Sequence, residues 1–105
     1  MMEAAISEQL GCADLLRALG EETRLLVVKH LLEKPRHAKD LQSLLGIEQS
    51  LLSHHLRHLR ESGIVESERD GKSVLYRLAA GAESRRDGHA LDLGCCRLSF
   101  QNTCC

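Results

Sequence analysis

The fold is decided by residues 37–62, HAKDLQSLLGIEQSLLSHHLRHLRES. Apolar residues recur at helical spacing on both sides of Gly46, and a glycine at that point is typical of a helix end. We expect a short helix over residues 37–45 and a longer one over residues 49–62. Leu52, Leu56 and Leu59 fall on one face of the second helix. A short helix, a turn containing glycine and a longer helix form a helix-turn-helix pattern.

The residues after this pattern predict a β-hairpin. Residues 64–69 and 73–78 have strand character on either side of Asp70-Gly71, a strong two-residue turn signal. In the second run, Val74, Tyr76 and Leu78 alternate on one face. The expected fold is therefore mainly α (α+β), a winged helix-turn-helix with a two-stranded β-hairpin wing.

The flanking segments are less uniform. Apolar spacing predicts helices over residues 3–19 and 21–34, interrupted by Gly20 and ended by Pro35. Beyond Leu78 the composition loosens, and the tail could be a loop, a short helix or an extended arm.

Composition limits the class of protein. The chain has 105 residues, 43% of them apolar, but only two aromatic side chains, Tyr76 and Phe100, so the core must be aliphatic. No run approaches the roughly 20 apolar residues of a membrane span, and residues 1–3 do not begin a secretory signal. We expect one small, soluble, cytoplasmic domain that would gain stability by dimerising.

The charge alone does not indicate a nucleic-acid partner. The net charge is −1, and residues 36–77 hold seven basic and six acidic residues, which is a weak excess. A symmetric dimer would double the basic surface, and DNA affinity grows with the number of phosphates neutralised.

The free face of the second helix carries the candidate DNA contacts. Short and medium polar side chains near its start can reach base edges in the major groove: Gln49, Ser50, Ser53 and His54. Arg57 and Arg60 lie further along and suit phosphates, while Arg69 and Lys72 flank the hairpin tip. The alternative is an ordinary solvated helix face.

The stretch from Leu19 to Leu78 resembles the ArsR/SmtB family of winged-helix regulators. The similar pieces are LRALGEETRLLVVKHLLEK, DLQSLLGIEQSLLSHHLRHLRESGIV and RDGKSVLYRL. The family's Q-S-x-x-S-x-H-L run corresponds here to Gln49, Ser50, Ser53, His55 and Leu56. The resemblance implies a homodimeric repressor of double-stranded operator DNA whose first and last helices form the dimer contact. It does not imply an enzyme.

Five cysteines suggest a second site. Cys12 lies near the N-terminus, and the tail holds two adjacent pairs, Cys95–Cys96 and Cys104–Cys105. Without a secretion signal we expect reduced thiols. Thiolates select soft ions such as zinc or copper(I), and arsenic(III) and antimony(III) prefer three thiolates. Adjacent cysteines supply two sulfurs without long-range folding, and Cys104 or Cys105 can supply the third.

The known sensor sites of the resembled family narrow this choice. The C-V-C pair of many arsenic sensors is absent from residues 36–45, and Asp87 and His89 match only the first half of a zinc site. What remains resembles the arsenic(III) repressors with a C-terminal Cys-Cys pair and a later third cysteine. The expected inducer is arsenite or antimonite, and no organic cofactor is expected.

Several alternatives remain open. Cys12 is expected to be mainly a packing residue, and the terminal pair could be chemically idle. Four cysteines could hold structural zinc. His54, His55 and His58 cluster on the second helix, where His55 could be half-buried and hydrogen-bonded. Oxidants or polysulfide could instead act on the thiols, with a bridge expected between the two tail pairs. A thiol oxidoreductase is disfavoured, because the pairs lie in a glycine-containing tail.

These interpretations divide the chain in two. Residues 1–78 form the winged helix-turn-helix DNA-binding domain, and residues 79–105 form a cysteine-containing tail for sensing and dimerisation.

Overall fold

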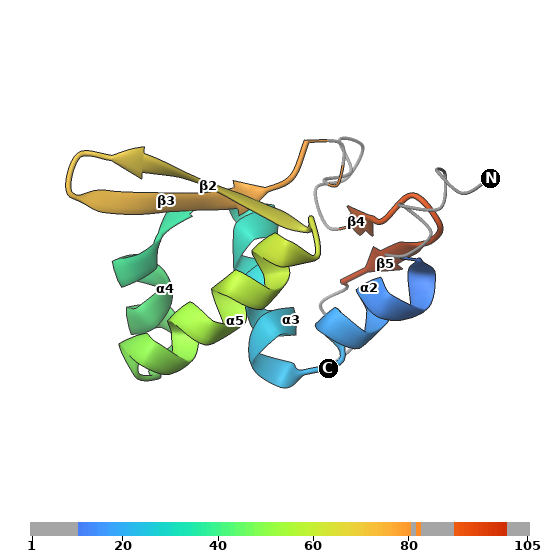
Figure 1. The fold of residues 1–105 in the computed structure, drawn as a ribbon, viewed down its shortest axis with the longest axis horizontal. Coiled ribbons are helices and arrows are strands. Elements are labelled where there is room, and N and C mark those ends of the chain that lie inside the picture. The colour runs from blue at the N-terminus through green and yellow to red at the C-terminus, as the bar shows by residue number, and fades with distance from the viewer. Residues whose placement is uncertain (1–10, 81, 83–89, 101–105) are drawn as a thin grey trace.

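The computed structural model describes residues 11–80, 82 and 90–100. The α2–α5 helices precede the long β2–β3 hairpin, and Figure 1 shows α4 and α5 on one side of that hairpin, with α2 at the opposite end of the molecule from the hairpin tip. The bounds are α2 (Cys12–Leu19), α3 (Glu22–Glu33), α4 (Ala38–Leu45), α5 (Gln49–Glu61), β2 (Val65–Asp70) and β3 (Ser73–Leu78). The expected winged helix-turn-helix is confirmed.

Local chemistry sets the helix boundaries. The Glu21 side chain accepts a hydrogen bond from the Arg24 backbone N–H at 3.0 Å and so caps the start of α3. Gly46 adopts a φ of 67° at the end of α4, a left-handed conformation that glycine adopts without strain. The helices expected over residues 21–34, 37–45 and 49–62 are therefore present, each within a residue or two of its predicted ends.

The wing differs from the sequence prediction in two ways. Strands β2 and β3 pair from Val65↔Leu78 to Asp70↔Ser73, so the two-residue turn is Gly71-Lys72, one position later than expected. A short strand, β1 (Arg36–His37), pairs with β3 on its other edge, which gives the sheet order β1-β3-β2. This third strand ties the start of α4 to the wing.

One aliphatic core holds the helices and both sheets together. Val27, Val28 and Leu41 are fully buried, and Leu52, Leu56 and Leu59 of α5 face inward as predicted. Tyr76 of β3 joins the same cluster. In the part of the chain that the structure describes, no helix is long and apolar enough to span a membrane.

The described part of the tail forms a second hairpin. Strand β4 (Ala90–Asp92) pairs antiparallel with β5 (Arg97–Ser99), and Figure 1 shows this hairpin beside α2. Leu91 is fully buried in the common core, and Leu98 and Phe100 pack against it. Residues 90–100 therefore do not form the last helix that the family resemblance implied.

Candidate nucleic-acid interface and thiol cluster

The exposed face of α5 gathers the predicted DNA contacts on one surface. Because Leu52, Leu56 and Leu59 point into the core, the polar residues of the helix lie on the opposite side. The exposed residues there are Gln49, Ser50, Ser53, His54, Arg57 and Arg60. The first five of them line a shallow hollow in the surface. Their assignment to DNA stays a prediction.

The wing tip presents two exposed basic side chains, Arg69 and Lys72, where they were expected. Arg77 on β3 differs, because its guanidinium donates a 2.6 Å hydrogen bond to Glu68 and lies 3.7 Å from Glu66. The hydrogen bond to Glu68 raises the pKa of Arg77 above its ordinary value. The basic charge available to a phosphate backbone at the wing is thus at the tip rather than along the strand.

His55 lies inside the protein although its neighbour His54 is exposed. Its side chain is buried, and its Nδ1 atom lies 3.2 Å from Nη1 of Arg24. Arginine can only donate, so Nδ1 is the acceptor and the imidazole is neutral in this contact. Burial lowers the pKa of His55 from 6.5, with Glu21 opposing and Arg24 adding to the shift. The histidine therefore connects α5 to α3. This agrees with the alternative that His55 is a hydrogen-bonded residue inside the protein.

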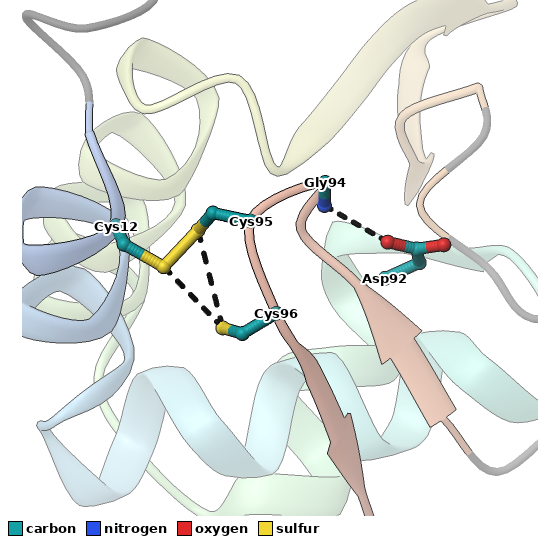
Figure 2. Close-up of a disulfide and its surroundings, with 5 residues drawn as sticks. All are labelled: Cys12, Asp92, Gly94, Cys95 and Cys96. Atoms are coloured by element: carbon teal, nitrogen blue, oxygen red, sulfur yellow. Dashed lines mark hydrogen bonds between the residues drawn. A yellow bond between two sulfur atoms is a disulfide. The ribbon is translucent and has the colours of Figure 1, made fainter.

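Three sulfur atoms meet at the end of the molecule away from the wing. Cys12 and Cys95 form a disulfide with their Cα atoms 5.9 Å apart. The Cys96 Sγ lies 3.5 Å from that of Cys12 and 4.0 Å from that of Cys95. Figure 2 shows the three side chains pointing toward one another, one from α2 and two from the turn before β5. We call these residues the thiol cluster.

The β4–β5 turn places two of these cysteines. The Asp92 carboxylate accepts a 2.8 Å hydrogen bond from the Gly94 backbone N–H, and Gly94 adopts a φ of 89°. The Leu93 N–H donates to the Cys96 carbonyl at 2.9 Å and closes the turn. Cys12 is the first residue of α2, where the helix dipole favours negative charge. The site thus joins the first described helix to the tail.

The structure corrects the sequence interpretation of the cysteines. Cys95 and Cys96 lie together as predicted, but the third sulfur of the described residues comes from Cys12, which was expected to be a packing residue. The thiols were expected to be reduced, and any bridge was expected within the tail; instead, Cys95 bonds to Cys12. The predicted ligands Cys104 and Cys105, like Asp87 and His89, lie outside the described residues.

Comparison with known proteins agrees with this architecture. Residues 21–67 match the family described as "Bacterial regulatory protein, arsR family". A solved structure of HlyU from Vibrio cholerae superimposes with a TM-score of 0.64 at 31% identity, over 77% of this chain and 84% of that one. The chain belongs to the arsR family. The matched residues of this arsR-family chain include α3, α4 and α5 and end within β2.

Two further relatives of the arsR-family chain bear on function. The HTH-type transcriptional repressor SmtB of Mycobacterium tuberculosis is 44% identical over 69 residues, which is 66% of this chain and 51% of the repressor. A homodimeric winged helix-turn-helix DNA-binding domain, Mb0332 of Mycobacterium bovis, has a TM-score of 0.66 at 28% identity, over 75% of this chain and 71% of that domain. The chain spans about half the length of the SmtB repressor. These relatives are regulators by name and not enzymes.

Proposed function

We propose that this chain is a cytoplasmic, homodimeric transcriptional repressor that releases its operator when arsenite or antimonite binds to cysteine thiolates. In this proposal residues 1–78 bind DNA, and the tail of residues 79–105 completes the sensor. The observation that carries the sensor is the meeting of three sulfur atoms within 4.8 Å of one another.

The DNA-binding half rests on the shape and chemistry of α5. A helix fits the roughly 12 Å major groove of B-DNA if one face is free of tertiary contacts, and the polar face of α5 is exposed along its length. Residues near the start of the helix suit base edges, and the wing-tip cations suit the phosphate backbone. The similarity to the homodimeric Mb0332 domain supports a two-fold symmetric reader of an inverted repeat.

The sensing half rests on the spacing of the sulfur atoms. Three sulfurs that share one thiophilic atom through bonds of about 2.3 Å lie roughly 3.5 to 3.8 Å apart. Cys96 already lies 3.5 Å from Cys12 and 4.0 Å from Cys95. Reduction of the Cys12–Cys95 bond would free two thiols beside the Cys96 thiol, and the three sulfurs would then lie near the arrangement that a pyramidal arsenic(III) requires. Cys12 then replaces the tail pair as the third ligand.

The test titrates the phosphine-reduced protein with arsenite, because dithiol reductants themselves bind arsenic. Operator binding is followed by fluorescence anisotropy on DNA from the chain's own promoter, together with sulfur-to-arsenic absorbance. We expect Cys95→Ser and Cys96→Ser to bind the operator but not release it. The Cys104→Ser/Cys105→Ser double variant retains release if Cys12 is the third ligand. Normal release by both single variants, or no salt-sensitive, sequence-selective DNA binding, would overturn the proposal.

The Cys12–Cys95 disulfide supports a second candidate, a repressor whose signal is oxidation or polysulfide. Here closure of the bond, rather than capture of a metalloid, changes DNA affinity. Peptide mass spectrometry after peroxide and after arsenite separates the two, since only the first leaves a crosslink between the peptides of Cys12 and Cys95. Operator release after peroxide alone favours the redox signal.

A further inference from the structure

Leu51 is an exposed leucine in the first turn of α5, the helix whose polar face is the predicted DNA contact. It is the third residue of the helix, and 45% of its surface is exposed. The other leucines of α5 are buried in the core: Leu52, Leu56 and Leu59. A single exposed leucine is common on protein surfaces, so its position must decide whether it has a role.

The position of Leu51 is at the edge of the polar face of α5. Successive helical residues are about 100° apart, so Leu51 is exposed although Leu52 is buried. Residues three apart are neighbours on a helix surface, which places Leu51 beside His54. His54 lines the shallow hollow of the polar face together with Gln49 and Ser50. Figure 1 shows that α5 begins on the side of the molecule toward which the wing tip extends, so both can approach one duplex.

The polar side chains of this face leave one feature of the major groove unread. Thymine presents an O4 acceptor and a C5-methyl group there, whereas cytosine presents an amino donor. Glutamine, serine and histidine side chains can exchange hydrogen bonds with base edges, but a methyl group is read by apolar contact. Among the described residues of α5, Leu51 is the exposed apolar side chain.

We propose that Leu51 is a specificity-determining residue that packs against the C5-methyl group of a thymine in each half-site of the operator. The inference rests on the DNA-binding half of the proposed function and does not involve the thiol cluster. In the free protein the leucine side chain and the thymine methyl group both face water, and their contact removes apolar surface of both from water. A two-fold symmetric dimer makes this contact twice.

The test replaces the thymines of the operator, one position at a time, with deoxyuridine, which lacks the C5-methyl group and still pairs with adenine. The affinity of phosphine-reduced protein is measured by fluorescence anisotropy at one salt concentration. We expect one sensitive position in each half-site, and the two positions to be related by the operator's symmetry. Loss of one buried methyl group corresponds to about a fourfold weaker affinity, and loss of the symmetric pair to about 15-fold.

Variants assign the effect to one side chain. Leu51→Ala should bind the thymine and deoxyuridine operators equally, because it cannot reach the methyl group. Leu51→Met keeps a long apolar side chain and should retain the preference for thymine. Leu44→Ala is the matched control, since Leu44 is 48% exposed but lies on α4, and it should also retain the preference.

The comparison does not depend on a loss of folding. Position 51 is exposed and alanine has a high helix propensity, so we expect Leu51→Ala to melt within a few degrees of wild type. Both operators are titrated at lower salt if the variant binds weakly, because phosphate contacts strengthen as salt falls.

The inference is overturned if no deoxyuridine substitution weakens binding of the wild type. It is also overturned if Leu51→Ala prefers thymine as strongly as the wild type does. Both results leave the proposed repressor in place, because its sequence-selective binding is measured on the unmodified operator. Absence of selective binding to that operator by the wild type would instead remove the proposed function and this inference with it.

Discussion

Replacing Cys12 with serine should lower the thermal stability of the oxidised protein by a large and calculable amount. The Cys12–Cys95 disulfide joins residues 83 positions apart. In the chain-entropy model, closing a loop of this length stabilises the folded state by about 4.5 kcal/mol at 25 °C. With an unfolding entropy of about 2.1 cal/mol/K per residue, a chain of this length melts about 20 °C lower without the bond.

The assay is thermal unfolding, followed by circular dichroism at one protein concentration, because a dimer's melting temperature depends on concentration. Cys96→Ser is the matched control, since Cys96 is outside the bond. Phosphine-reduced wild type should have the same melting temperature as Cys12→Ser. A bridge between the two tail pairs would close only about ten residues and contribute about 2.7 kcal/mol. The reasoning fails if oxidised Cys12→Ser has the same melting temperature as oxidised wild type. It also fails if peptide mapping of the oxidised protein shows a disulfide between Cys95 and the C-terminal pair.

Three further predictions concern DNA contact, pH and the core. The Arg69→Ala/Lys72→Ala double variant should lower the slope of log affinity against log salt by about 3.6 in anisotropy titrations, because the homodimer loses two phosphate contacts from each protomer; an unchanged slope removes the wing tip from the interface. Burial lowers the pKa of His55, so the unfolded chain binds more protons just below pH 6.5. The free energy of unfolding should therefore fall on acidification from pH 6.5 to the lowered pKa, by at most about 1.36 kcal/mol per pH unit. In urea denaturation, the free energy of unfolding of His55→Gln should lack this pH-dependent fall. If His55→Gln and wild type show the same pH dependence, the prediction is wrong. Leu41→Ala, at a fully buried position, should cost about 2 to 5 kcal/mol in urea denaturation, whereas Leu44→Ala, 48% exposed, should cost less than about 0.5 kcal/mol; equal losses contradict the burial argument.

The helices and the wing could be predicted because their signals are local. Gly46 and Pro35 end helices through their own backbone preferences, and the leucine spacing of α5 fixes which face is buried. The exposed polar face of α5, which is the predicted DNA contact, follows directly from that burial. A turn near Asp70-Gly71 was equally local, and only its register shifted by one residue.

The thiol cluster could be predicted only in part, because it depends on contacts between distant segments. Cys95 and Cys96 are consecutive residues, so their proximity follows from the sequence. Cys12 lies close to them only because the β4–β5 hairpin packs beside α2. That hairpin had a weak local signal: Leu91 and Leu93 alternate on either side of Asp92, and Gly94 follows. Its strands are three residues each, too short for periodicity alone to distinguish them from a loop.

The placement of the thiol cluster also constrains how any signal could reach DNA. A hollow of about 740 Å³ lies beside the cluster, and it is bounded by the turn of residues 62–64, which directly follows α5. Ile64 of that turn is buried, and its carbonyl accepts a 2.9 Å hydrogen bond from Ala79 after β3. The thiol cluster and α5 are therefore connected through the turn of residues 62–64 and its hydrogen bond to Ala79.

That connection sets an energetic requirement on the inducer. A ligand that fits two conformations equally well shifts neither, however tightly it binds. A hundredfold loss of operator affinity requires about 2.7 kcal/mol of differential binding. A disulfide and a bound arsenic atom hold the same cysteines at different separations, since arsenic stands between the sulfurs and a disulfide joins them directly. Disulfide formation and arsenic binding would therefore act differently on the turn after α5. The operator affinity of one chain need not change in the same direction with both signals.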